Sequence, residues 1–130
     1  MNTSRPLEAV SNATTKPPVL VVDDEVLIRM LIADVLRDLG LVVIECGDAH
    51  EALDVLQSGT LVSLVFSDVR MPGSIDGAEL ATIVKRDYPG SKVILTSAQQ
   101  IPAGAHCDHF FTKPWDVPHV VRHIQSLIGI

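Results

Sequence analysis

The chain has 130 residues, a net charge of -6 at pH 7, and 47% hydrophobic but only 4% aromatic residues. With no run of Lys or Arg, this acidic balance argues against direct nucleic-acid binding, which needs a basic patch. Two cysteines make no disulfide framework, no signal-peptide pattern opens the chain, and no apolar run reaches the roughly 20 residues of a membrane helix. We expect one cytoplasmic domain without membrane insertion, its core built from Val, Leu, Ile and Ala.

The N-terminal segment is polar, contains prolines and shows no apolar periodicity, so residues 1–17 are predicted to be a flexible tail before a folded domain at 18–130. The apolar run at 19–22 then predicts a strand that is buried on both faces. From 28 to 39, apolar residues recur at helical spacing, and Gly40 is the predicted end of that helix.

The strand and helix patterns go on alternating through the middle of the chain. Strands are predicted at 41–46, 61–67 and 92–97, with a helix after each of the first two. Asp48 with Glu51, and Asp76 with Glu79, have the spacing of residues that cap the starts of those helices.

The last third of the chain is less regular. Residues 98–107 contain Pro102 and Gly104 and lack an apolar stripe, so a fourth helix there should be short or irregular. A brief strand is predicted at 110–112. A final helix should begin near Asp116, with a proline in its first turn.

Five strands alternating with helices predict an α/β fold, a flavodoxin-like doubly wound five-stranded parallel sheet with strand order 2-1-3-4-5. In such sheets, ligands bind outside the carboxyl ends of the strands where the strand order reverses. Asp23 and Asp24 follow the first strand, and Asp68 ends the third, so their carboxylates should meet at this edge.

Carboxylates that meet need a counter-charge, since two like charges about 4 Å apart repel by roughly 4 kcal/mol at an effective dielectric near 20. Oxygen ligands that leave room for water and phosphate favour Mg²⁺. Ser97 and Lys113 close the fourth and fifth strands, which adds a hydroxyl and an ammonium. Alone, Asp68 could start a turn, Ser97 or the Asp pair could cap a helix, and Lys113 could be a solvated turn residue. Together they predict an anion site around a nucleophile.

Four motifs carry a resemblance to a known family. They are Val-Leu-Val-Val-Asp23-Asp24-Glu25, Phe-Ser-Asp68-Val-Arg-Met71-Pro72 with Asp76-Gly77 after it, Val-Ile-Leu-Thr-Ser97-Ala98, and Phe-Thr-Lys113-Pro114. Over about residues 18–128 the chain resembles the receiver domains of two-component response regulators.

The resemblance implies that Asp68 is the phospho-acceptor and that a histidine kinase or phosphotransfer protein is the donor. It implies a Mg²⁺ site formed by Asp23, Asp24, Asp68 and the backbone carbonyl of Arg70. It also implies phosphoryl contacts from Ser97 and Lys113. We prefer Ser97 to Thr96 because the family's hydroxyl residue usually precedes a small residue, here Ala98. Such a domain catalyses only its own phosphorylation and dephosphorylation.

In the family, Ser97 would couple to an aromatic switch residue early in the fifth strand, and Phe110 holds that position. Arg70 and Gln99 occupy positions that tune the phosphoryl lifetime in receivers. The loop between Met71-Pro72 and Asp76-Gly77 is one residue longer than the common form, and the spacing from Ser97 to Lys113 is short.

The chain ends soon after the last predicted helix, so we expect no DNA-binding or enzymatic output domain. The output is then docking on an unknown downstream protein or onward phosphotransfer, with a homodimer as another option. Trp115 is either a partner anchor or a half-buried lid on the last helix.

Two other readings stay open. A phosphorylation-independent receiver would act only as an interaction module. A metal-binding module would use His106-Cys107-Asp108-His109 together with His119 and His123, which are one helical turn apart. A Ser-His-Asp hydrolase has no support, because the chain lacks a G-x-S-x-G elbow.

Overall fold

The computed structural model describes residues 16–130, so most of the predicted tail at 1–17 lies outside the described residues. The elements in chain order are β1 (Val19–Val22), α2 (Val26–Asp38), β2 (Val43–Cys46), α3 (Ala49–Gln57), β3 (Leu64–Asp68), α4 (Gly77–Asp87), β4 (Lys92–Ser97), β5 (His109–Thr112) and α5 (Val117–Ile128). All strand pairs are parallel in the order β2-β1-β3-β4-β5, which confirms the predicted flavodoxin-like topology.

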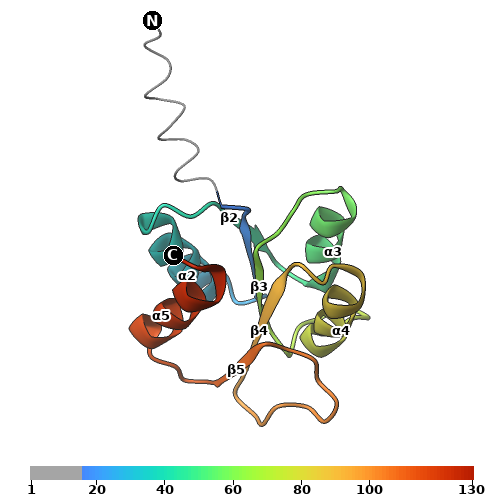
Figure 1. Cartoon of the computed structure of the whole chain (residues 1–130). Helices are drawn as coiled ribbons and strands as arrows, with labels where there is room; N and C mark the ends of the chain where they lie inside the picture. The colour runs from blue at the N-terminus through green and yellow to red at the C-terminus, as the bar shows by residue number, and fades with distance from the viewer. Residues whose placement is uncertain (1–15) are drawn as a thin grey trace, which may run out of the picture.

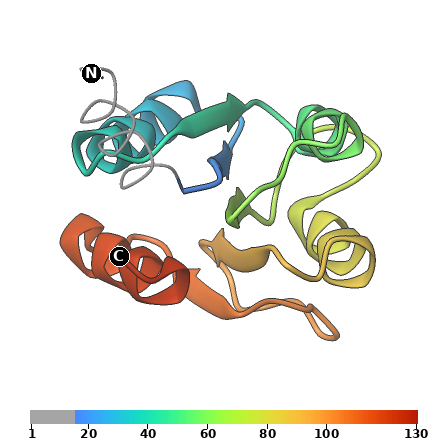
Figure 2. The same ribbon diagram turned by 45° about the horizontal axis from the view of Figure 1, so that its top comes forward.

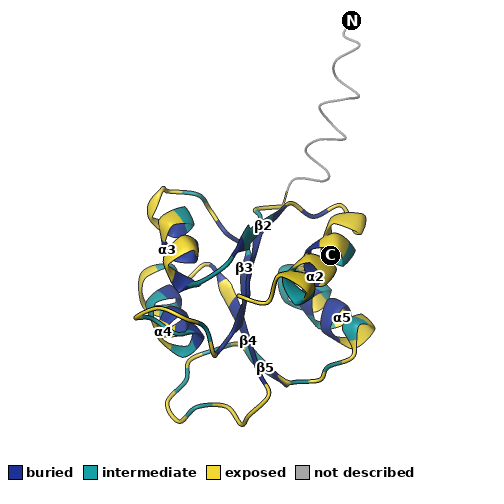
Figure 3. Cartoon of the chain, turned by 180° about the vertical axis from the view of Figure 1, so that it is seen from behind, coloured by how far each residue is buried: buried dark blue, intermediate teal, exposed yellow. Residues whose placement is uncertain are grey.

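The fold has three layers, with the sheet in the middle. Figure 1 shows α2 and α5 on one face of the sheet and α3 and α4 on the other, and Figure 2 shows the same pairing from a second direction. Along β1, Leu20 packs into the core under α3 and α4, whereas Val21 packs into the core under α2 and α5. Both faces are covered, so β1 and β3 are buried along their whole length, as the apolar runs at 19–22 and 64–66 predict. Figure 3 shows β3 in the colour of buried residues.

Side-chain caps fix where three of the helices begin. The Asp48 carboxylate accepts from the Glu51 N–H at the start of α3, and Asp76 and Glu79 form a complete capping box on α4. Asp116 caps α5 by accepting from the His119 N–H. These caps confirm the helix starts predicted from the sequence.

The connection from β4 to β5 contains no helix, so residues 16–130 hold four helices in all. This is the limiting case of the predicted short or irregular fourth helix. Asp108 anchors the end of the connection, because its Oδ2 accepts from the Val93 N–H at 2.7 Å and lies 2.9 Å from Lys85 Nζ. None of the helices in the described part combines the length and the apolar character needed to cross a bilayer.

Candidate functional site

The carboxyl edge of the sheet brings together residues that are far apart in the sequence. Val22 pairs with Ser67, so Asp23 after β1 and Asp68 at the end of β3 come out side by side. Asp68 is the last residue of β3, one residue beyond the predicted strand. Both carboxyl groups are buried, with Asp23 4% and Asp68 8% exposed.

Lys113 follows β5 and places its ammonium among three carboxylates. Its Nζ lies 3.3 Å from Asp68 Oδ2, 3.7 Å from Asp23 Oδ2 and 3.4 Å from Glu25 Oε1. The three acidic side chains can place one oxygen each within 4.8 Å of the others. One ammonium cannot neutralise three carboxylates, so the cluster is short of positive charge.

Burial and mutual charge shift the proton affinities in this cluster. Burial raises the pKa of Asp68 above its ordinary value and outweighs the opposing charge of Lys113. Burial also raises the pKa of Asp23, against the hydrogen bond from the Glu25 N–H and the charge of Lys113. Burial lowers the pKa of Lys113, but the charges of Asp23 and Asp68 outweigh it, so the net shift is upward. The folded site therefore favours the charged form of Lys113 and disfavours the charged forms of Asp23 and Asp68.

Glu25 is a site residue that the sequence analysis did not single out. It precedes α2, and its backbone N–H donates to Asp23 Oδ1 at 2.9 Å. Asp24, by contrast, is exposed and lies outside the convergent group, although its charge adds to the raised pKa of Asp68. The predicted place of Asp24 and of the Arg70 carbonyl in a metal site stays a prediction.

Two neighbouring hydroxyls end β4, and both are buried. Ser97 Oγ accepts from the Gln99 N–H at 3.1 Å, whereas Thr96 Oγ1 has no hydrogen-bond partner within the described residues. Thr96 is the register partner of Asp68. Ser97 lines a polar cavity of about 380 Å³ next to the β3–α4 loop. The preference for Ser97 over Thr96 as the phosphoryl contact remains a prediction.

The same cavity is bridged by two side chains from opposite loops. The Arg70 guanidinium donates from Nη2 to Gln99 Oε1, and both residues line the cavity. They connect the loop after Asp68 to the segment after Ser97. This contact makes the two positions one structural unit beside the phosphorylation site predicted for Asp68.

Gly77 fixes how closely α4 approaches Asp68. A Cβ at residue 77 would lie 2.0 Å from the Asp68 carbonyl oxygen and 2.8 Å from Val69 Cα. The Gly77 N–H donates to the Val69 carbonyl at 2.8 Å. Only glycine allows this approach, so α4 presses directly against the backbone that carries the central carboxylate.

The aromatic residues named in the sequence lie on the two faces of the sheet. Phe110 is half-buried against the core under α3 and α4, and its switch role stays a prediction. Trp115 is half-buried as well and meets Phe66 edge-on, with ring centroids 5.9 Å apart. Its indole N–H is buried without a hydrogen-bond partner among the described residues.

The histidines do not form the metal centre that the alternative reading needs. His109 and His123 place their ring centroids 3.8 Å apart at an interplanar angle of 32°, which is a stacked contact. In residues 16–130 the one convergent group of three or more ligand-type side chains is the acidic cluster. The described structure therefore gives the acidic edge, and not the histidines, as the place for a cation.

Several known proteins are similar to this chain in sequence. The chain spans 24% of the nitrogen assimilation regulatory protein NtrX of Azorhizobium caulinodans, with 33% identity over 112 residues that cover 79% of the chain. It is 34% identical over 127 residues to the transcriptional regulatory protein PdtaR of Mycobacterium tuberculosis, covering 92% of the chain and 60% of PdtaR. It is 28% identical over 130 residues to the sensor kinase CckA of Brucella abortus, covering 94% of the chain and 14% of the kinase.

A solved structure of the response regulator TrrA from Thermotoga maritima, in complex with Mg(2+)-BeF, superposes with a TM-score of 0.76. The two chains are 28% identical, and the match covers 86% of this chain and 99% of TrrA. The sequence model of the response regulator receiver domain matches residues 19–125, which is most of the described chain. The protein belongs to the response regulator receiver domain family.

Proposed function

We propose that the chain is a working receiver in which Asp68 accepts a phosphoryl group from a phosphohistidine on a sensor histidine kinase or phosphotransfer protein. The observation that carries the proposal is the buried Asp68 carboxylate, held 3.3 Å from the Lys113 ammonium at the point where the strand order reverses. Ligands bind at this point in open parallel sheets. A buried, charge-strained carboxylate in such a place is also a strong functional candidate.

The chemistry is a transfer between two nucleophiles. An Asp68 carboxylate oxygen forms a bond to phosphorus while the P–N bond of the donor breaks, and the imidazole leaves with the electron pair and takes up a proton. An aspartyl phosphate remains. Such transfers need positioning and charge stabilisation above all, and Lys113, whose Nζ lies 3.3 Å from Asp68 Oδ2, would contact the oxygens of the phosphoryl group.

The acidic cluster fits Mg²⁺, which prefers oxygen ligands and keeps several waters. Asp23, Asp68 and the Arg70 carbonyl would hold it, with Asp24 from the sequence prediction and Glu25 from the observed cluster as further ligands. When bound, the ion supplies positive charge where the phosphoryl oxygens gather. The complex of the relative TrrA with Mg(2+)-BeF supports this assignment.

The donor needs a surface next to Asp68, and α2 offers one. Four apolar side chains on this helix are exposed, and we call them the α2 apolar face: Val26 51%, Leu27 81%, Met30 45% and Leu31 49%. The face borders an apolar cavity of about 340 Å³ that is also lined by Lys113 and Trp115. Exposed apolar patches mark protein-binding sites. We propose that the phosphodonor docks there, which places its histidine beside the acidic cluster.

The output of the phosphorylated domain is proposed to be docking on a downstream protein or onward transfer to a phosphotransfer histidine. The cytoplasm is the proposed location; Cys46 and Cys107 form no disulfide in the described structure, so the fold does not require an oxidising compartment.

The test is incubation with a small phosphodonor such as acetyl phosphate, with and without Mg²⁺, followed by intact-mass analysis. The expected result is one phosphoryl adduct that is stable in acid and labile in base, absent without Mg²⁺ and absent from Asp68→Asn. An adduct of equal yield in Asp68→Asn would overturn the assignment. No adduct with this donor or with a panel of kinases would favour the phosphorylation-independent module.

A further inference from the structure

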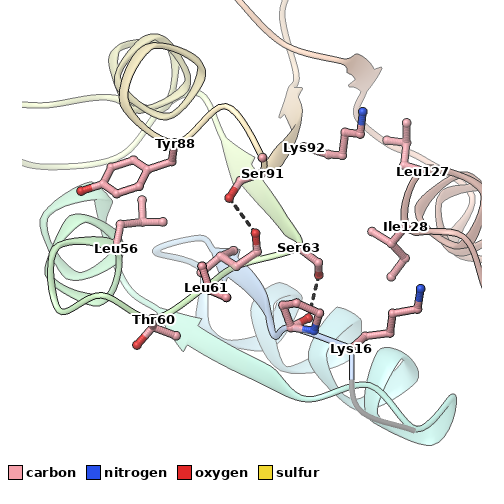
Figure 4. Close-up of a pocket in the computed structure, with 13 residues that line it drawn as sticks. Lys16, Leu56, Thr60, Leu61, Ser63, Tyr88, Ser91, Lys92, Leu127 and Ile128 are labelled. Carbon is pink, nitrogen blue, oxygen red and sulfur yellow. Dashed lines mark hydrogen bonds between the residues drawn. The ribbon is translucent and has the colours of Figure 1, made fainter. Parts of the chain in front are cut away.

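A third cavity opens at the amino-terminal edge of the sheet, the edge opposite Asp68. It has a volume of about 450 Å³ and is walled by the residues that lead into β1, β3 and β4 and by the end of α5. Figure 4 shows this cavity. Since Asp68 ends β3 whereas Val62 and Ser63 of the cavity wall precede that strand, a ligand here would leave the acidic cluster open.

Most of the cavity wall is apolar. Leu56, Leu61, Val62, Leu127 and Ile128 contribute aliphatic side chains, and Tyr88 adds its ring. Small-ligand sites typically have volumes of about 300 to 1,000 Å³ with a mainly apolar lining and a few polar groups that set orientation. The cavity has this size and character.

The hydroxyl groups of two wall serines are already used by the framework. Ser91 Oγ donates to the Val62 carbonyl at 2.6 Å, and Ser63 Oγ donates to the Pro17 carbonyl at 2.8 Å. These bonds tie together the segments around the cavity. They leave neither of these serine protons free to orient a ligand.

The charged groups at the wall are two lysines, and one of them, Lys92, also acts by its charge on Asp108 and lowers the pKa of that carboxyl. Lys16 and Lys92 are exposed, and neither has an ion-pair partner within residues 16–130. Figure 4 shows both on the same side of the cavity as Leu127 and Ile128, with Leu56 and Tyr88 across from them. In a chain of net charge -6, two exposed cations beside an apolar cavity complement a ligand that is apolar at one end and anionic at the other.

We propose that this cavity binds an amphipathic monocarboxylate, a molecule with the chemistry of a medium-chain fatty acid. The carboxylate would pair with the ammonium group of Lys16 or of Lys92 at the rim of the cavity, and the alkyl chain would lie across Leu61 toward Leu56 and Tyr88. The position of the cations at the rim would fix the carboxylate end of the molecule and so the direction of its alkyl chain. A bound molecule would connect the entry to β1 with the end of α5 and stabilise the domain by mass action.

The experiment is calorimetric titration of the full chain with decanoate, kept below its micelle concentration. The expected result is saturable binding to one site. The double variant Lys16→Gln/Lys92→Gln should weaken binding by about tenfold or more, and Leu61→Glu should weaken it similarly. All three positions are exposed, so these variants should fold. Lys85→Gln, which changes a lysine outside the cavity, should bind within about twofold of the parent.

Two further titrations distinguish binding in this cavity from binding at the acidic cluster and from non-specific hydrophobic binding. Asp68→Asn should bind decanoate with the parent's affinity, and the uncharged analogue decanol should bind about tenfold more weakly or worse. The proposal is overturned if the parent shows no saturable binding, or if decanol binds as tightly as decanoate. The proposal is also overturned if both Lys16→Gln/Lys92→Gln and Leu61→Glu bind decanoate as tightly as the parent, or if Asp68→Asn loses binding.

Discussion

Lys113→Met tests whether the acidic cluster depends on Lys113, the described residue whose side-chain cation lies within 4 Å of its carboxylates. In the parent, Nζ lies 3.3 Å from Asp68 Oδ2 and 3.7 Å from Asp23 Oδ2, and the lysine side chain is only 16% exposed. Each contact is a Coulomb attraction of roughly 5 kcal/mol at an effective dielectric near 20. Much of that attraction is offset by the cost of burying the ammonium, so the attraction itself overstates the net effect.

The free energy of proton uptake by the cluster sets a better upper limit on the loss of stability in Lys113→Met. Once Lys113 is gone, a carboxylate of the cluster can be neutralised by taking a proton, which costs about 4 kcal/mol at pH 7 for a group with an ordinary pKa near 3.9. Removing one partner of a buried ion pair typically costs about 3 to 5 kcal/mol. We therefore expect Lys113→Met to lower the free energy of unfolding by about 2 to 4 kcal/mol at pH 7.

The sign of the pH dependence follows from this proton. The folded variant binds one more proton than the folded parent, so its deficit in stability should shrink by up to about 1.4 kcal/mol per pH unit as the pH falls. It stops shrinking when Asp23 and Asp68 of the parent, whose pKa values burial raises, begin to protonate too. The raised pKa of Lys113 supplies stability that is lost only at high pH, as the pH rises through that value.

The assay is urea unfolding of parent and variant in EDTA, at steps from about pH 4.5 to about pH 8, which spans the expected titration. Lys92→Met is the matched control, because Lys92 is an exposed lysine with no ion pair among the described residues. A loss below about 0.5 kcal/mol at pH 7, or a loss that does not change with pH, would refute the reasoning, since exposed pairs behave in that way.

Three further outcomes are expected. Gly77→Ala should lower the free energy of unfolding by about 1 to 3 kcal/mol through overpacking and should slow phosphorylation of Asp68 by acetyl phosphate. Gly90→Ala is the control, because no atom lies within 4 Å of the added Cβ, and it should leave the rate of phosphorylation unchanged. Asp68→Asn should be more stable than the parent at neutral pH in urea unfolding, because a carboxyl with a raised pKa favours the folded state only as the neutral acid; equal stability at pH 7 would contradict the burial argument. Leu27→Asp on the α2 apolar face should slow phosphoryl transfer from a phosphorylated kinase about tenfold or more and leave labelling by acetyl phosphate intact. The control is Leu61→Asp, because Leu61 is 78% exposed and Leu27 is 81% exposed. If both variants slowed the transfer equally, α2 would not be the docking site.

Much of the fold could be predicted because burial on both faces leaves a direct mark in the sequence. Residues 19–22 and 64–66 are continuous apolar stretches; Asp23 follows the first directly, and Asp68 follows the second after one serine, both at the carboxyl edge of the sheet. Given the strand order, the meeting of Asp23, Asp68 and Lys113 follows. The capping of α3, α4 and α5 was predictable for a similar reason, since Asp at the N-cap is a local preference.

The features that escaped prediction depend on backbone geometry outside the regular elements. Glu25 joins the cluster because the turn after β1 directs its side chain toward Lys113, and no periodic pattern encodes that turn. Likewise, the Arg70–Gln99 contact joins two loops 29 positions apart. The complete loss of a helix in the β4–β5 connection was visible only as weak periodicity with a proline and a glycine.

If Asp68 is phosphorylated as proposed, the absence of a helix between β4 and β5 would give Lys113 a particular importance in signalling. Its ammonium contacts Asp68, and its backbone N–H donates to the Ser97 carbonyl at 2.8 Å, so it connects the acid cluster to the end of β4 as well as to β5. A phosphoryl group on Asp68 would add negative charge and draw the same ammonium toward itself. Because no helix lies between β4 and β5, we expect the resulting movement to reach residues 98–108 and β5, where a partner can read it. Hydrogen exchange in residues 98–112 should therefore change on phosphorylation of the parent and stay unchanged in Lys113→Met.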